Sequence, residues 1–198
     1  MIVLPFKRFT VCLHFSFFAT VSLLILLENN SCALLALYAC IIHETGHIIA
    51  MILVKQQIEK LCFYGAGIKI INRKTTEQKS FAEDAFVLSA GCLINITIYI
   101  IAVLFFGNNK DVLFFGVINL MIGLFNLLPV NAFDGGKLLV LLFYKAFPID
   151  IACEMEKYLK KINILIVFTV IIAFALYGCT NFTLYITLLY LLFTSIFL

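Results

Sequence analysis

Long apolar runs separated by short polar connections dominate the chain. A helix needs about 20 apolar residues to cross the roughly 30 Å hydrocarbon core of a bilayer. Runs that approach this length cover residues 9–27, 32–54, 84–106, 112–130, 162–178 and 181–198. The pattern therefore predicts an all-α polytopic membrane protein with about six transmembrane helices, organised as a single membrane domain over residues 1–198.

Two stretches depart from this pattern. Residues 138–147 are apolar over half a span only, so they either continue the fourth span beyond a break or lie at the membrane interface. Residues 55–80 form the long polar connection, in which β-branched and aromatic residues surround Gly65 and Gly67. This composition predicts a small membrane-associated β-hairpin.

The first apolar run resembles a signal peptide, because Lys7 and Arg8 precede it. It is longer than the apolar core of a signal peptide, however, and no small-x-small cleavage site precedes Glu28. We therefore expect residues 9–27 to be a retained first span.

Composition supports a membrane protein. Hydrophobic residues make up 64% of the chain and charged residues 13%, whereas soluble domains average about 45–50% apolar and about 25% charged residues. The seven cysteines contain no Cys-x-x-Cys pair, so they are interpreted as small hydrophobes and not as a disulfide framework or a zinc-thiolate site.

The basic residues predict the orientation. With six spans and a cytoplasmic amino terminus, 13 of the 14 lysines and arginines lie on the inner side, and only Lys110 lies outside. The positive-inside rule therefore favours cytoplasmic amino and carboxyl termini. These inner segments also account for the net charge of +3, so the charge gives no reason to expect a nucleic-acid partner.

The second run contains the polar sequence His43-Glu44-Thr45-Gly46-His47. On a helix, residues four apart lie on one face, so His43 and His47 can reach one metal ion while Glu44 contacts a water beside it. This is the hydrolytic zinc pattern. In the middle of a membrane span these groups would be costly unless they were paired or faced a cavity, which favours a metal site over a polar contact between helices.

Catalytic zinc usually has three protein ligands, so one is missing. His14 is interpreted as a polar group between helices, and Glu154 and Glu156 lie in a solvated charged stretch. Asp134 follows a helix break at Pro129 and precedes two glycines that permit a turn. We predict that Asp134 is the third ligand; the alternative is an Asp-Gly-Gly turn at the membrane surface.

These motifs carry a resemblance to a known family. His43-Glu44-Thr45-Gly46-His47 followed by NLLPVNAFDGGKLL resembles the site-2 proteases, which are intramembrane zinc metalloproteases. Asn126, Pro129, Asp134 and Gly135 match the second family signature, and Gly91 with Asn95 match an element of the intervening span. The matched region, residues 32–145, corresponds to the three-helix catalytic core, with accessory spans at 9–27, 162–178 and 181–198. The arrangement is similar to the bacterial branch that includes the sporulation protease of a membrane-associated pro-sigma factor, without the cytoplasmic nucleotide-sensing domain of that branch.

The resemblance implies one Zn²⁺ held by His43, His47 and Asp134, with Glu44 as the general base. Asn95 or Asn126 would donate hydrogen bonds to the oxyanion or to the substrate backbone. It further implies regulated intramembrane proteolysis of a single-span or membrane-tethered regulator near the cytoplasmic face, in a bacterial cell membrane. A second copy of the chain and a regulatory membrane protein are further candidate partners.

Three alternatives stay open at this point. Intramembrane histidines and aspartates also mark the pathways of metal transporters and channels. A non-catalytic membrane adaptor is the second alternative. The third is a zinc protease class with a distal glutamate ligand, for which Glu154 and Glu156 are the candidates.

Overall fold

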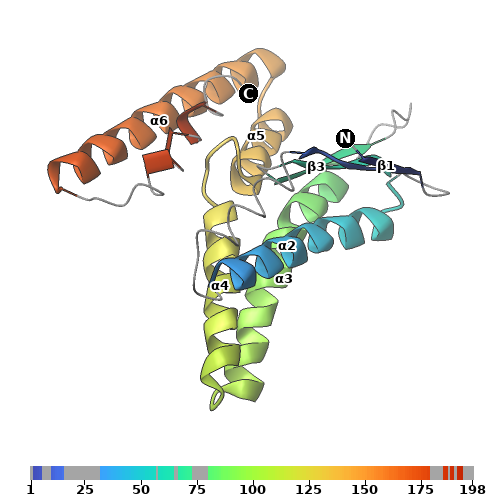
Figure 1. Ribbon diagram of the computed structural model, residues 1–198. Helices are drawn as coiled ribbons and strands as arrows, with labels where there is room; N and C mark the ends of the chain where they lie inside the picture. Colours follow the sequence, from blue (N-terminus) through green and yellow to red (C-terminus); the bar gives the residue numbers. More distant parts are fainter. Residues whose placement is uncertain are drawn as a thin grey trace. The chain divides into compact units, whose positions relative to one another are not determined.

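The computed structural model describes residues 2–5, 10–15, 32–56, 58–64, 67–72 and 80–178, with 185–186, 188–189 and 191–193. The elements are, in chain order, β1 (Ile2–Pro5), β2 (Thr10–Leu13), α2 (Cys32–Leu53), β3 (Ile58–Tyr64), β4 (Gly67–Asn72), α3 (Phe81–Phe106), α4 (Lys110–Asn126), α5 (Asp134–Ala146) and α6 (Ile149–Leu176) (Figure 1). They fall into two compact units, Met1–Gly123 and Leu124–Leu198.

In the first unit, α2 packs against α3 through small residues. A Cβ atom added to Gly46 would lie only 2.8 Å from the Ala90 carbonyl oxygen and 3.1 Å from the Gly91 Cα atom. Helices in membranes associate by this kind of close backbone packing, because lipid leaves little hydrophobic driving force between them. The contact therefore fixes which turn of α2 faces α3.

Helices α3 and α4 form the second close contact of this unit and run side by side (Figure 1). A Cβ atom on Gly116 would lie 2.8 Å from Ala102 Cβ, and one on Gly123 would lie 3.3 Å from Asn95 Cβ. The turn between the helices is capped by Asn109, whose side-chain oxygen accepts hydrogen bonds from the N–H groups of the next turn at 3.1 and 3.3 Å. Such a cap satisfies donors that a helix start otherwise leaves open.

The first unit also contains a four-stranded sheet in the order β1-β2-β3-β4. Strands β3 and β4 pair antiparallel, which confirms the predicted hairpin. Strand β2 pairs antiparallel with β1 and parallel with β3, with Cys12 opposite Cys62.

The sheet corrects one prediction. Residues 10–13 belong to β2 and not to the start of a first transmembrane helix over 9–27. Short apolar runs do not distinguish strand from helix by pattern alone, and here pairing with the distant residues 60–63 stabilises the extended form. From residue 16 onward, the predicted first span lies outside the described residues.

The second unit begins at Leu124, within the last turn of α4. Between α4 and α5 the chain is held by short backbone hydrogen bonds, among them Val130 N–H to the Leu128 oxygen at 2.7 Å and Phe133 N–H to the Val130 oxygen at 2.8 Å. Helix α5 then starts at Asp134, so the half span at 138–147 belongs to a separate helix. Its Tyr144 hydroxyl donates to Glu156 on α6 at 3.0 Å, which ties α5 to α6.

Helix α6 differs from its prediction. It runs unbroken through 28 residues from Ile149, so the charged stretch before residue 162 and the fifth predicted span form one helix. Strong helix formers such as Glu, Met, Leu and Lys occupy this stretch, so the helix continues through it. The hydropathy pattern missed this, because it reports polarity and not helix propensity. Most of the sixth predicted span, 181–198, lies outside the described residues.

Among the described residues, α2, α3 and α6 are long and apolar enough to cross a membrane. Helix α4 has 17 residues, fewer than the roughly 20 that a spanning helix needs. Large apolar side chains are exposed on these helices, for example Leu104 at 70% and Phe105 at 75%, as expected for surfaces that contact lipid. The structure thus confirms a largely helical membrane protein with a small sheet, while the number of six spans stays a prediction.

Candidate metal centre

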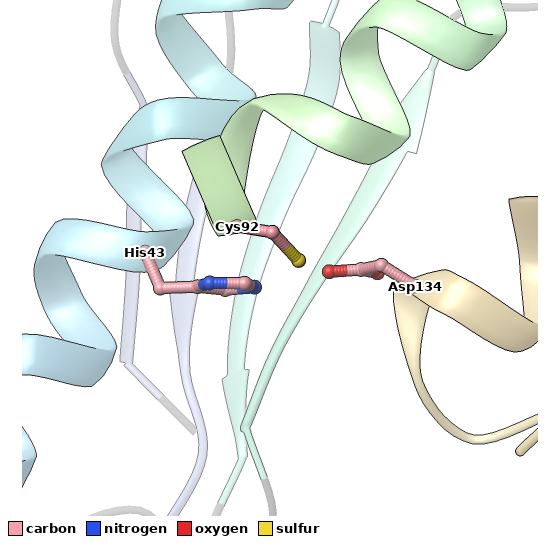
Figure 2. Close-up of side chains that lie close together, drawn as sticks. All are labelled: His43, Cys92 and Asp134. Carbon is pink, nitrogen blue, oxygen red and sulfur yellow. The ribbon is translucent and has the colours of Figure 1, made fainter. Parts of the chain in front are cut away.

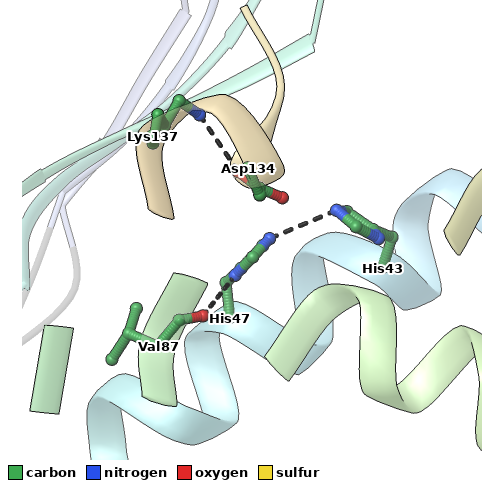
Figure 3. A network of polar contacts seen from close by, with 5 residues as sticks. All are labelled: His43, His47, Val87, Asp134 and Lys137. Atoms are coloured by element: carbon green, nitrogen blue, oxygen red, sulfur yellow. Dashed lines mark hydrogen bonds and ion pairs between the residues drawn. The ribbon is translucent and has the colours of Figure 1, made fainter. Parts of the chain in front are cut away.

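His43 and His47 lie together on α2 and are 4% and 7% exposed. Their Nε2 atoms are 3.2 Å apart (Figure 3). A tetrahedral zinc ion with Zn–N bonds of about 2.0–2.1 Å holds two ligand nitrogens about 3.3–3.4 Å apart. The pair therefore has the separation that a single zinc ion requires.

The carbonyl of Val87 on α3 orients His47. It lies 2.7 Å from His47 Nδ1, and because a carbonyl only accepts hydrogen bonds, Nδ1 carries the proton. This leaves the lone pair on Nε2, the atom that faces His43. Histidine ligands of metals commonly have their other ring nitrogen held in this way, and a backbone acceptor gives no signal in the sequence.

Gly91 allows α3 to lie directly against both imidazole rings. A Cβ atom at this position would lie 2.8 Å from Cε1 and Nε2 of His43 and would collide with Nε2 of His47. Gly91 was singled out in the sequence only through the family resemblance. The structure supplies a physical reason for it, because any larger residue would push the rings or the helix away.

Cys92 is a neighbour that sequence reasoning missed. It is 1% exposed, and its Sγ atom lies within 4.8 Å of a ring nitrogen of His43 (Figure 2). A cysteine inside an apolar run has the same sequence signal as any small hydrophobe. Only the packing of α3 on α2 shows that this one adjoins a histidine pair.

Two further predicted residues lie in the first unit. Glu44 is partly buried and adjacent to His43 on α2. Asn95 lies one helical turn beyond Gly91 on α3 and is fully buried, and neither polar atom of its side chain has a hydrogen-bond partner in the described parts of the chain. A buried amide in that state is available to a substrate or to water.

Asp134 is the first residue of α5 in the second unit and is 8% exposed. The Nζ atom of Lys137, one turn further along α5, forms an ion pair with the Asp134 carboxylate at 3.0 Å (Figure 3). The helix amino terminus also favours a negative charge at this position. Sequence reasoning did not identify Lys137 as the partner of Asp134.

The glycines after Asp134 have a role other than the predicted turn. Neither has a positive φ. A Cβ atom on Gly135 would collide with the Leu127 carbonyl, and one on Gly136 with the Val130 carbonyl. The two glycines thus let the first turn of α5 press against the backbone of the preceding segment, which fixes where Asp134 begins its helix.

Of the predicted site residues, the structure brings His43, Glu44 and His47 together on α2. Asn95 lies on α3, which packs against α2. Asp134 and the half-buried Asn126 belong to the second unit, and their roles as ligand and hydrogen-bond donor stay predictions.

Comparison with known proteins agrees with the motifs. The model of Peptidase family M50 matches residues 107–170, a segment that contains Asn126, Pro129 and Asp134. No curated protein matches the sequence. The fold is similar to that of the solved structure "Site-2 Protease from Methanocaldococcus jannaschii", with a TM-score of 0.69 and 20% sequence identity over 98% of this chain and 93% of that chain. At this identity the structural match establishes the fold. The family-model match and the buried His-Glu-x-x-His agree with this likeness: the chain has the fold of a site-2 protease, and part of it resembles Peptidase family M50.

Proposed function

We propose that the chain is an intramembrane zinc endopeptidase that cleaves transmembrane or membrane-associated segments of proteins near the cytoplasmic face. The observation that carries the proposal is the pair of buried Nε2 atoms 3.2 Å apart in a helix long and apolar enough to span a membrane. Buried polar groups at this depth are costly unless they serve a partner. Zinc is the partner that fits their spacing.

His43, His47 and Asp134 are the proposed zinc ligands. When bound, zinc supplies a Lewis acid that polarises the scissile carbonyl and makes the attacking water more acidic. Glu44 accepts a proton from that water at its carboxylate and passes it to the leaving amine. Its place next to His43 on α2 supports this role, because a base must lie within reach of the proton that it removes.

Asn95 and Asn126 are proposed to donate hydrogen bonds to the oxyanion or to the unwound substrate backbone. For Asn95 the support is its full burial without a partner in the described part of the chain. The substrate class is a single-span protein or a membrane-tethered regulator. The distribution of lysine and arginine supports cytoplasmic termini, and the proposed location in a bacterial cell membrane rests on the family resemblance.

The test measures zinc per chain in mild detergent and cleavage of a model single-span substrate in parallel. Variants are Glu44→Gln and Asp134→Ala, with Glu154→Gln as a matched control that removes one carboxylate from an exposed position. We expect Glu44→Gln to keep zinc and lose cleavage, Asp134→Ala to lose both, and Glu154→Gln to behave like the parent. Removal of a catalytic base lowers the rate by about 10²–10⁴-fold.

Other results would overturn the proposal. Zinc-free parent protein, or full cleavage by Glu44→Gln, would end the zinc-protease mechanism. If Glu154→Gln lost zinc and Asp134→Ala kept it, the third ligand would be the distal glutamate. Zinc transport into liposomes by a parent that cleaves nothing would favour the transporter alternative.

A further inference from the structure

Two atoms that bind metals lie near the ring of His43, one from α2 and one from α3. Nε2 of His43 and Nε2 of His47 are 3.2 Å apart, and Sγ of Cys92 lies within 4.8 Å of a ring nitrogen of His43. Figure 2 shows the thiol extended toward the imidazole. Nitrogen and thiolate sulfur are the ligands that zinc takes most readily in proteins.

The thiol is within reach of a shared zinc ion. Tetrahedral zinc with a Zn–S bond of about 2.3 Å and a Zn–N bond of about 2.0–2.1 Å separates sulfur from nitrogen by about 3.5–3.6 Å. The sulfur lies within 4.8 Å of a ring nitrogen of His43, and rotation about the Cα–Cβ bond of Cys92 is the motion by which it would come closer. Burial of Cys92 to 1% exposure shields the thiol from competing reactions with solvent.

We propose that Cys92 is an additional zinc ligand that acts as a latch: it occupies the fourth coordination position of the zinc ion and keeps the site in an inactive resting state. This inference rests on the proposed function, because it concerns the same zinc ion. With His43, His47 and the proposed Asp134, the Cys92 thiolate makes four protein ligands. Closed four-ligand sites are structural, whereas catalytic sites keep one position open for water. The thiol binds as thiolate with release of its proton, and rotation of Cys92 away from the metal opens the position for water.

The experiment examines the metal directly. Zinc-loaded parent, Cys92→Ser, Cys92→Ala and the control Cys40→Ser are compared by X-ray absorption at the zinc edge. The cobalt-substituted forms are compared by near-ultraviolet charge-transfer absorption. Cys40 is a second cysteine on the histidine helix but is exposed. We expect a sulfur neighbour at about 2.3 Å in the parent and in Cys40→Ser, and its loss in both Cys92 variants while zinc is retained.

Cleavage provides the second readout. If the thiolate occupies the fourth position in half of the molecules or more, its removal should raise the rate of cleavage about twofold or more.

A parent that binds zinc and cleaves substrate, but shows only nitrogen and oxygen neighbours, would refute the latch and leave the proposed function intact. A sulfur neighbour that persists in Cys92→Ser, or an unchanged rate in Cys92→Ala, would also refute it. A parent without zinc would overturn the proposed function and the latch together. If both Cys92 variants fail to fold, the spectrum of the parent and of Cys40→Ser decides the outcome.

Discussion

Gly91→Ala is the most informative single change that the site offers. The new Cβ atom would lie 2.8 Å from Nε2 of His43 and closer still to Nε2 of His47. Non-bonded carbon atoms prefer separations of about 3.5 Å, so the rings or α3 must move by about 0.7 Å. Metal ligands tolerate displacements of only about 0.2 Å. The substitution should therefore weaken zinc binding while leaving every ligand present.

The expected loss is about 10–100-fold in zinc affinity, as for other changes next to metal ligands, which corresponds to about 1.4–2.7 kcal/mol. A competition titration against a chelator of known affinity measures it. Gly116→Ala is the matched control, because its Cβ atom would lie equally close, at 2.8 Å, to Ala102 Cβ between α3 and α4. Both variants should lose about 1–3 kcal/mol of stability through overpacking, but only Gly91→Ala should lose zinc affinity. Parent-like zinc affinity in Gly91→Ala, or an equal loss in Gly116→Ala, would refute the reasoning.

Two changes in the second unit test how Asp134 is held. Gly136→Ala should lower the thermal unfolding temperature, because the new Cβ atom would collide with the Val130 carbonyl. That carbonyl belongs to a segment fixed by backbone hydrogen bonds. Overpacking of this kind costs about 1–3 kcal/mol of stability. Gly107→Ala, whose Cβ atom would meet one carbonyl at 3.1 Å, is the control, and equal unfolding temperatures for the two variants would contradict the close packing. Lys137→Met removes the ion pair to Asp134, but Lys137 is 52% exposed, so unfolding in denaturant should reveal a loss below about 1 kcal/mol. A much larger loss would show that the lysine holds more than this one carboxylate.

The sequence predicted the elements whose signals are local. The β3–β4 hairpin, the break at Pro129 and the helix that carries His43 and His47 each follow from residues close together in the chain. Strand β2 could not be predicted in this way, because its parallel partner β3 lies far along the sequence and its apolar run reads equally well as a helix. Helix α6 was divided at residue 162 for a related reason: polarity changes there, but helical structure does not.

The site shows the same limit. The spacing of His43 and His47 requires a helix and nothing else, so it could be read directly. The Val87 carbonyl, the neighbouring Cys92 and the space that Gly91 leaves depend on the packing of α3 on α2, which no pattern within either helix encodes. His47 and Val87 are 40 residues apart in the chain.

The parallel pairing of β2 with β3 also has a consequence for biogenesis. About 50 residues, including the whole of α2, separate Thr10 from its partner Lys60. A ribosome adding about 5–20 residues per second needs roughly 3–10 s to make that interval. During this interval the strand that pairs in parallel with β2 does not yet exist, and an open strand edge can pair with the wrong chain. The histidine helix is therefore synthesised in full before the sheet can close, so the order of the elements along the chain delays completion of the sheet until after the metal-binding helix has been made.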